Sequence, residues 1–311
     1  MRSLHPHQRL RHTAWWAFLI WFFFPQWTKA IESSFEQLVD VGGHRLHIHC
    51  TGKGRPAVIM DAGLGGSSRD WRKVQEGVAT TTQACVYDRA GYNQSDPGPL
   101  PRTSSRIVSE LRTLLARAGI PPPYVLAGHS FGGFNMRLFA SFYSEETAGL
   151  VLVDAPHEGQ VDEFFQNHII RQIDPQGILK DLWRSGVLSS LAVGIEPLAA
   201  LLGMDPKTFR TIAGEAAAFR DSAAELESAT PRADLPLVVI MHGRRVLPYG
   251  PVGDDMEKSW IELQEDLVSR YKNAKLLLAK GSAHNIPLEE PEIVVRAIRE
   301  IIEAGTHSRA P

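Results

Sequence analysis

The motif with the clearest chemistry is Gly128-His129-Ser130-Phe131-Gly132, which directly follows an apolar run at residues 124–127. A G-x-S-x-G sequence between a strand and a helix places serine on a sharp turn, where small neighbours are needed because the backbone is crowded. Such a turn exposes the serine hydroxyl at the carboxyl edge of a sheet, close to a helix N-terminus. The motif therefore predicts a nucleophile at Ser130, with Gly128 and Gly132 as the small residues that the turn requires.

A serine hydroxyl becomes a good nucleophile only when a base removes its proton, so a histidine must lie within hydrogen-bond reach. The chain has 12 histidines. His284 is the strongest candidate because it lies in a loop between the last predicted strand and the terminal helix. His242 ends another predicted strand and is the competitor; we expect it to support the site or to be structural.

Acyl transfer also needs hydrogen-bond donors that face the oxyanion developing on the substrate. The loop Gly63-Leu64-Gly65-Gly66 follows a short apolar run at 57–61 and can supply one backbone N–H, which we assign to Leu64. Phe131, the residue after the nucleophile, would supply the other. Gly63 and Gly65 are interpreted as the glycines that shape this loop.

No metal and no organic cofactor is predicted. The glycine loop could be mistaken for a dinucleotide-binding fingerprint, but Ser68 occupies the position of its third glycine. His47 and His49 share one face of a predicted strand, which invites a metal interpretation. Without a third ligand, we expect them to lie on a solvated outer face of a hairpin.

The elements that position these residues alternate between short apolar runs and helical stretches, which predicts an α/β fold with a mostly parallel sheet. Runs at 35–41 and 44–50 predict a hairpin, and residues 104–118 carry apolar residues at helical spacing. Residues 155–234 contain no convincing strand, and a linker of about 80 residues is improbable between neighbouring strands, so we expect an inserted helical cap.

Apolar side chains of the expected cap favour a small-molecule substrate with a hydrophobic part, although they could equally pack the cap onto the core. These residues are Phe164, Phe165, Leu188, Leu191, Leu201 and Leu202.

The chain resembles the α/β-hydrolase superfamily, in the branch of serine esterases and lipase-like or peptidase-like enzymes. The resemblance covers roughly 35–154 and 235–304 and rests on the serine turn, the glycine loop and the segment of His284. It also rests on Tyr87-Asp88-Arg89-Ala90-Gly91-Tyr92 followed by Ser95-Asp96, which is similar to the family's loop after its fourth strand.

The resemblance implies an eight-stranded, mostly parallel sheet with helices on both faces, formed by residues 31–154 and 235–311. The helical cap at 155–234 would interrupt this core. No cofactor is implied.

The resemblance also implies an acid that orients the histidine, and the family's chain order of nucleophile, acid and histidine favours His284 over His242. The family commonly carries this acid after the strand that we predict at 237–241, but Gly243-Arg244-Arg245-Val246 follows here. Some relatives place it after the preceding strand, where this sequence has Asp154. We favour Asp154, with Asp254, Asp255 and Glu257 as alternatives.

Two cysteines complete what the resemblance implies. In the family's sheet the second strand runs antiparallel beside the fourth; Cys50 ends the former and Cys85 begins the latter. The two should therefore lie close together, as a disulfide or as two buried thiols.

The first 30 residues differ from the rest of the chain. They contain Arg and Lys but no acid, and an apolar run at 14–24 is closed by Pro25. A basic start, a short apolar centre and small residues at 28–30 indicate a signal peptide. A short uncleaved anchor or an interfacial segment is the alternative, with membrane association through residues 14–27. We expect an exported protein, secreted or periplasmic, or one anchored to a membrane.

The whole-chain composition of 311 residues is that of an ordinary globular protein. With 33 Lys+Arg against 35 Asp+Glu and no basic stripe, nucleic acid is not an expected partner.

The combined features predict a serine hydrolase that cleaves a carboxylic ester or related acyl bond through an acyl-enzyme. An amidase, a peptidase or a cofactor-free perhydrolase could use the same residues, and a catalytically silent binding protein is the alternative from another class. Serine rather than aspartate at the turn disfavours epoxide hydrolase or dehalogenase chemistry.

Overall fold

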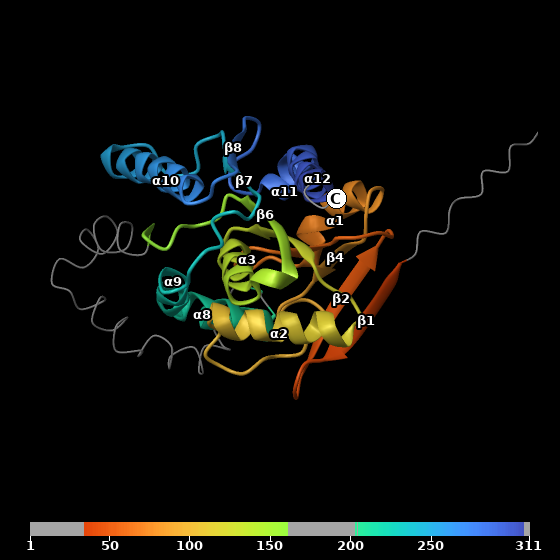
Figure 1. Cartoon of the computed structure of the whole chain (residues 1–311). Helices are drawn as coiled ribbons and strands as arrows, with labels where there is room; N and C mark the ends of the chain where they lie inside the picture. The colour runs from red at the N-terminus through yellow and green to blue at the C-terminus, as the bar shows by residue number, and fades with distance from the viewer. Residues whose placement is uncertain (1–33, 161–202, 204, 308–311) are drawn as a thin grey trace, which may run out of the picture. The chain divides into compact units, whose positions relative to one another are not determined.

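An eight-stranded sheet forms the centre of the described part of the computed structural model, which comprises residues 34–160, 203 and 205–307 (Figure 1). Its strand order is β1-β2-β4-β3-β5-β6-β7-β8. From β4 onward all neighbours are parallel, whereas β2 runs antiparallel to both β1 and β4. The strands are β1 (Phe35–Asp40), β2 (Arg45–Thr51), β3 (Ala57–Asp61), β4 (Ala84–Tyr87), β5 (Tyr124–His129), β6 (Thr147–Val153), β7 (Leu237–His242) and β8 (Ala274–Ala279). The predicted fold class is confirmed.

Helices cover both faces of this sheet because its central strands are apolar on both sides. In β3, Ile59 belongs to one hydrophobic core with residues of α2 and α3, whereas Val58 and Met60 belong to a second core with residues of α1 and α12. Figure 1 shows these helices around the sheet. The helical elements are η1 (Ser68–Trp71), α1 (Arg72–Ala79), α2 (Ser104–Arg117), α3 (Phe131–Phe142), η2 (Ser144–Glu146), α8 (Pro206–Ala217), α9 (Phe219–Glu227), α10 (Pro251–Ser269), α11 (Ile286–Glu289) and α12 (Pro291–His307).

A disulfide joins Cys50 of β2 to Cys85 of β4. The two residues are directly paired in the antiparallel register of these strands, and both are buried. The bond therefore lies inside the core and links the antiparallel edge of the sheet to its parallel part.

The expected cap at 155–234 is described at residues 155–160, 203 and 205–234. The described part contains two helices, α8 and α9, which meet at Ala218. Helix α9 packs on the core through Phe219, whose ring stacks on Phe134 of α3 at a centroid distance of 5.1 Å. Its Ser222 hydroxyl accepts a hydrogen bond from the N–H of Ser104 at the start of α2, at 2.9 Å.

Two sets of expectations lie outside the described residues. They are the leader at 1–30, with its apolar segment at 14–27, and the part of the cap that carries the six apolar residues named above. Among the helices that the structure describes, none is long and apolar enough to cross a membrane.

Candidate active site

Ser130 occupies a strained turn between β5 and α3. Its φ of 49° and ψ of −126° lie outside the regions that residues with a side chain favour. The neighbouring glycines are required by close backbone contacts. A Cβ on Gly128 would lie 2.5 Å from the carbonyl oxygen of Gly132, and one on Gly132 would lie 2.3 Å from the carbonyl oxygen of Asp61. The G-x-S-x-G spacing thus reflects the close packing of the turn against β3.

Ser130, His284 and Asp154 form a continuous hydrogen-bonded chain. The distance from Ser130 Oγ to His284 Nε2 is 2.9 Å, and the distance from His284 Nδ1 to Asp154 Oδ2 is 2.7 Å. Asp154 directly follows β6, is fully buried and has a φ of 45°. His284 lies between β8 and α11, and its side chain keeps 34% of its surface exposed. A buried acid, an accessible imidazole and a hydroxyl in this order can transfer a proton away from serine.

The alternative acids lie elsewhere. Asp254 is on α10, where it pairs with Arg245 at 2.6 Å, and Asp255 on the same helix is exposed. Glu257 Oε1 lies 2.9 Å from His242 Nε2. The structure thus places Asp154, and none of these three, on His284.

His242, expected to be supporting or structural, contacts the same acid. Its Nδ1 lies 2.7 Å from Asp154 Oδ1, and its backbone N–H donates to that oxygen at 3.1 Å. Both ring nitrogens face carboxylate oxygens, and an ionised carboxylate only accepts hydrogen bonds, so this geometry favours the doubly protonated ring. Burial by itself lowers the pKa of His242, but the hydrogen bond and charge of Asp154, together with Glu257, outweigh it and raise the pKa above its ordinary value.

The acid is stabilised as a carboxylate. Burial by itself raises the pKa of Asp154, but hydrogen bonds from His242 and His284 outweigh burial, so the pKa lies below its ordinary value. Asp154 therefore stays ionised and accepts the Nδ1 proton of His284, which leaves Nε2 of that ring as the base toward Ser130.

His129 supports the loop of His284 rather than taking part in the chain. Its Nε2 lies 2.8 Å from the backbone oxygen of His284 and so carries the donated proton. Burial and the neighbouring His284 lower the pKa of His129 to about 4. The ring is therefore neutral at physiological pH.

The glycine loop lies against the serine turn, where it borders a cavity of about 250 Å³. A Cβ on Gly63 would lie 3.1 Å from Ser130 Cβ, so a side chain at position 63 would crowd the nucleophile. Phe131 is the first residue of α3, so its N–H has no acceptor within its own helix. The cavity is lined by Gly63, Leu64, Gly65, Gly66, Asp70, His129, Ser130, His284 and Asn285.

The expectation of a solvated outer face at His47 and His49 is wrong for His47, which is buried. Its Nδ1 lies 2.8 Å from Asp88, and its Nε2 lies 2.7 Å from Glu36. The loop after β4 covers this face of the hairpin. Over the part of the chain that the structure describes, no group of three or more His, Cys, Asp or Glu residues is arranged to hold a metal ion.

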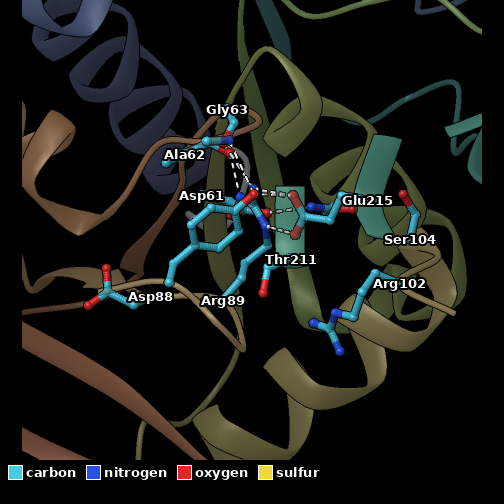
Figure 2. A network of polar contacts seen from close by, with 12 residues as sticks. Asp61, Ala62, Gly63, Asp88, Arg89, Arg102, Ser104, Thr211 and Glu215 are labelled. Atoms are coloured by element: carbon cyan, nitrogen blue, oxygen red, sulfur yellow. Dashed lines mark hydrogen bonds and ion pairs between the residues drawn. The ribbon is translucent and has the colours of Figure 1, made fainter. Parts of the chain in front are cut away.

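Sequence reasoning missed a buried ionic network behind the glycine loop. Figure 2 shows Arg89, from the loop after β4, between Asp61 at the end of β3 and Glu215 of α8. All three side chains are buried. Arg89 belongs to the motif that resembles the family's loop after its fourth strand, but nothing in the sequence near Glu215 marked it as a partner.

This fold and this serine turn define a class of protein, and comparison with known sequences identifies it. Residues 58–297 match the alpha/beta hydrolase family, to which the chain therefore belongs. The uncharacterized protein YqjL of Bacillus subtilis is 27% identical over 278 residues, which cover 89% of this chain and 95% of YqjL. The putative carbamate hydrolase RutD of Azorhizobium caulinodans is 30% identical over 113 residues, which cover 36% of this chain and 42% of RutD.

Solved structures share the fold at low sequence identity. The epoxide hydrolase CorEH superposes with a TM-score of 0.62 at 15% identity, over 87% of this chain and 99% of CorEH. A thermophilic esterase from Thermogutta terrifontis superposes with a TM-score of 0.56 at 19% identity, over 87% of this chain and 99% of the esterase. Because these neighbours differ in chemistry, they show the fold, and the reaction has to be argued from the site.

Proposed function

We propose that this protein is a serine hydrolase that cleaves carboxylic esters through an acyl-enzyme. The observation that carries the proposal is the unbroken chain from Ser130 Oγ through His284 to the buried Asp154. Serine at the strained turn supports an acyl-enzyme rather than the aspartyl ester that dehalogenase or epoxide hydrolase chemistry would need.

In the proposed reaction, Ser130 Oγ attacks the ester carbonyl carbon while His284 Nε2 takes the hydroxyl proton. The carbonyl oxygen becomes an oxyanion, which the N–H groups of Leu64 and Phe131 would stabilise. The C–O bond to the alcohol then breaks, and His284 returns the proton to the leaving alcohol. Water, deprotonated by His284, hydrolyses the acyl-enzyme and restores the serine.

Amide and peptide bonds, and a cofactor-free perhydrolase reaction, would use the same residues. Three assays separate these reactions. A panel of p-nitrophenyl esters with acyl chains of increasing length tests ester cleavage, matched anilides test amide cleavage, and added hydrogen peroxide tests the perhydrolase reaction. We expect ester turnover to exceed anilide turnover, because an alcohol leaves more readily than an amine. A substrate with a hydrophobic part is a proposal that the same panel tests.

Labelling with a fluorophosphonate probe tests the nucleophile. We expect the wild-type protein to be labelled and Ser130→Ala to remain unlabelled. Equal labelling of both would refute Ser130, and no labelling of the wild type would support a catalytically silent binding protein.

The acid is tested by comparing Asp154→Asn with Asp254→Asn, a matched change of an exposed aspartate. Loss of the carboxylate that fixes the histidine tautomer should lower kcat about 10⁴-fold for Asp154→Asn, as for the corresponding change in a serine protease triad. Asp254→Asn should be near normal. Normal turnover of Asp154→Asn would overturn this assignment.

A further inference from the structure

We propose that Glu215, on the cap helix α8, is a positioning residue of the oxyanion hole: it holds Arg89, which in turn holds the glycine loop. This inference rests on the proposed function, because it concerns the loop that would stabilise the oxyanion. It assigns to a helix of the expected cap a role in transition-state stabilisation.

Arg89 contacts the glycine loop through two backbone oxygens. Its Nη1 donates to the carbonyl of Ala62 at 2.6 Å, and its Nη2 donates to the carbonyl of Gly63 at 2.9 Å. The carbonyl of Gly63 and the N–H of Leu64 belong to the same planar trans peptide group, in which the two point in opposite directions. Fixing the Gly63 carbonyl on Arg89 therefore fixes the direction of the Leu64 N–H. A cationic donor on the carbonyl also polarises the peptide and makes its N–H a stronger donor.

Glu215 holds the guanidinium of Arg89 with both carboxylate oxygens. Arg89 Nε donates to Oε1 at 2.8 Å, and Nη2 donates to Oε2 at 2.9 Å (Figure 2). Such a bidentate pair fixes the plane of the guanidinium as well as its position. Glu215 is fully buried, so water cannot replace these contacts.

Tyr92 gives Glu215 a second path to the same loop. The Tyr92 hydroxyl donates to Glu215 Oε2 at 2.8 Å and accepts the N–H of Gly65 at 3.2 Å. The carboxylate thus reaches the glycine loop through Arg89 at Gly63 and through Tyr92 at Gly65.

Asp61 connects the network to the second expected oxyanion donor. Arg89 Nη1 donates to Asp61 Oδ1 at 2.7 Å, and Asn135 of α3 donates to Asp61 Oδ2 at 2.7 Å. The guanidinium also lies 5.6 Å from the ring centroid of Phe131. One arginine therefore contacts both segments that would supply oxyanion donors, and its position depends on a residue of the cap.

Helix α8 lies directly on the loop that carries Arg89. A Cβ on Gly91 would lie 1.7 Å from the hydroxyl oxygen of Thr211 on α8. The loop can approach the helix this closely because position 91 is glycine. Displacement of α8 would remove one carboxylate from a buried arginine, which is strongly unfavourable, and would release the Gly63 peptide.

The test compares Glu215→Gln with Glu225→Gln. Glu225, on α9, also ties the cap to the core, since it accepts hydrogen bonds from the N–H and hydroxyl of Ser105 at 2.8 and 2.5 Å. These two bonds lead to α2 rather than to Arg89 or the glycine loop. The measurements are kcat and KM on a p-nitrophenyl ester, Ki for an alkylboronic acid, which forms a tetrahedral adduct on serine, and the melting temperature.

We expect Glu215→Gln to lower kcat about 10-fold or more and to raise the boronate Ki by a similar factor, since loss of a whole oxyanion donor lowers kcat about 10²–10³-fold. KM should stay within about 2-fold, because the donor acts mainly in the transition state. Glu225→Gln should keep wild-type kcat and Ki even where its melting temperature falls.

Tyr92→Phe is the second test variant, which also serves if Glu215→Gln fails to fold. It removes the link from Glu215 to Gly65 while Glu215 stays paired with Arg89. It should lower kcat and boronate affinity together, by a smaller factor. Wild-type kcat and Ki in the folded Glu215→Gln or Tyr92→Phe variant would overturn the inference and leave the proposed function intact. A wild-type protein that neither labels with fluorophosphonate nor binds the boronate would overturn both.

Discussion

At the scale of single residues, the unusual feature of the site is that one carboxylate serves two histidines. His284 Nδ1 lies 2.7 Å from Asp154 Oδ2, and His242 Nδ1 lies 2.7 Å from Oδ1 and 2.9 Å from Oδ2. His242 lies between Asp154 and Glu257, and the raised pKa of its ring favours the imidazolium form. We infer that His242 holds the Asp154 carboxylate in the plane that suits His284.

The protonation of His242 makes a prediction about stability and pH. Its pKa is raised above the ordinary value of 6.5, so the folded state binds this proton more tightly than the unfolded chain does. The resulting stabilisation is complete below pH 6.5 and is lost as the pH rises through the raised pKa. We expect His242→Gln to have a lower free energy of unfolding than the wild type at low pH. This difference should become smaller as the pH rises.

Urea denaturation of both proteins at several values from about pH 5.5 to about pH 9 measures this gap. His47, whose pKa is also raised, is present in both proteins and cancels in the difference. A gap that stays constant, or widens as the pH rises, would show that His242 is not the imidazolium that its contacts favour.

Sequence reasoning could reach Ser130 because a strained turn leaves a local signature, the two glycines. It reached His284 from its place in a loop between the last predicted strand and the terminal helix. Asp154 was favoured through the family resemblance, because some relatives carry the acid after the preceding strand and the family's usual position holds no acid here. The roles of His242, Glu257 and Glu215 could not be read in the same way. Glu215 meets Arg89 across a separation of 126 residues, and nothing in a helix sequence indicates which buried arginine a glutamate will meet.

At the scale of elements, the segment after β6 is tied to two helices by one buried carboxylate. Glu158 pairs with Arg137 of α3, at 2.7 Å, and with Arg270 at the end of α10. Burial by itself raises the pKa of Glu158, but the charge and hydrogen bond of Arg137 outweigh it and lower the pKa to about 2. The segment that follows β6 is thereby fixed to the core.

This contact predicts acid sensitivity. A lowered folded pKa gives stabilisation that is present above the ordinary value of 4.5 and is lost as the pH falls toward about 2. Glu158→Gln should therefore be less stable than the wild type at neutral pH, and the difference should shrink between about pH 4.5 and about pH 2. Glu76→Gln, which removes an exposed pair with Arg72, is the matched control and should change stability little at any pH.

Urea titrations of the three proteins measure both differences. An equal destabilisation by Glu158→Gln at pH values above and below this window would contradict the ionised, paired state of Glu158.

Element prediction succeeded where periodicity was strong and failed where a distant loop decided the outcome. The strands and α2 follow from apolar runs and helical spacing. The outer face of the hairpin was predicted to be solvated because the alternation of side chains along a strand distinguishes its two faces but does not show what covers each face. Ser95, in the loop after β4, accepts the N–H of His47 at 2.9 Å, and that coverage is a tertiary property.

At the scale of the whole molecule, the disulfide makes a prediction about stability. Cys50 and Cys85 are separated by 35 residues. Closing such a loop lowers the conformational entropy of the unfolded chain, which stabilises the folded state by about 3–4 kcal/mol in the loop-entropy model. The double variant Cys50→Ala/Cys85→Ala should therefore unfold at lower urea concentration than the oxidised wild type. Wild-type protein that is unfolded, reduced and alkylated keeps its sulfur atoms but has no crosslink. It is therefore the control for the loss of sulfur atoms in the double variant.

An unchanged midpoint for the double variant would contradict a stabilising crosslink. The bond also favours folding in an oxidising compartment. That agrees with the exported location expected from the leader, which stays a prediction.

The position of the disulfide also has a topological consequence. The covalent ring that it closes, from Cys50 to Cys85, contains β3, the glycine loop and α1. If a protease cut the exposed loop at Leu64, the two fragments would stay attached through the sulfur atoms. The nicked protein would run as a full-length chain on a gel without reductant and separate into two pieces only after reduction. A preparation with a cut glycine loop would thus keep its apparent mass.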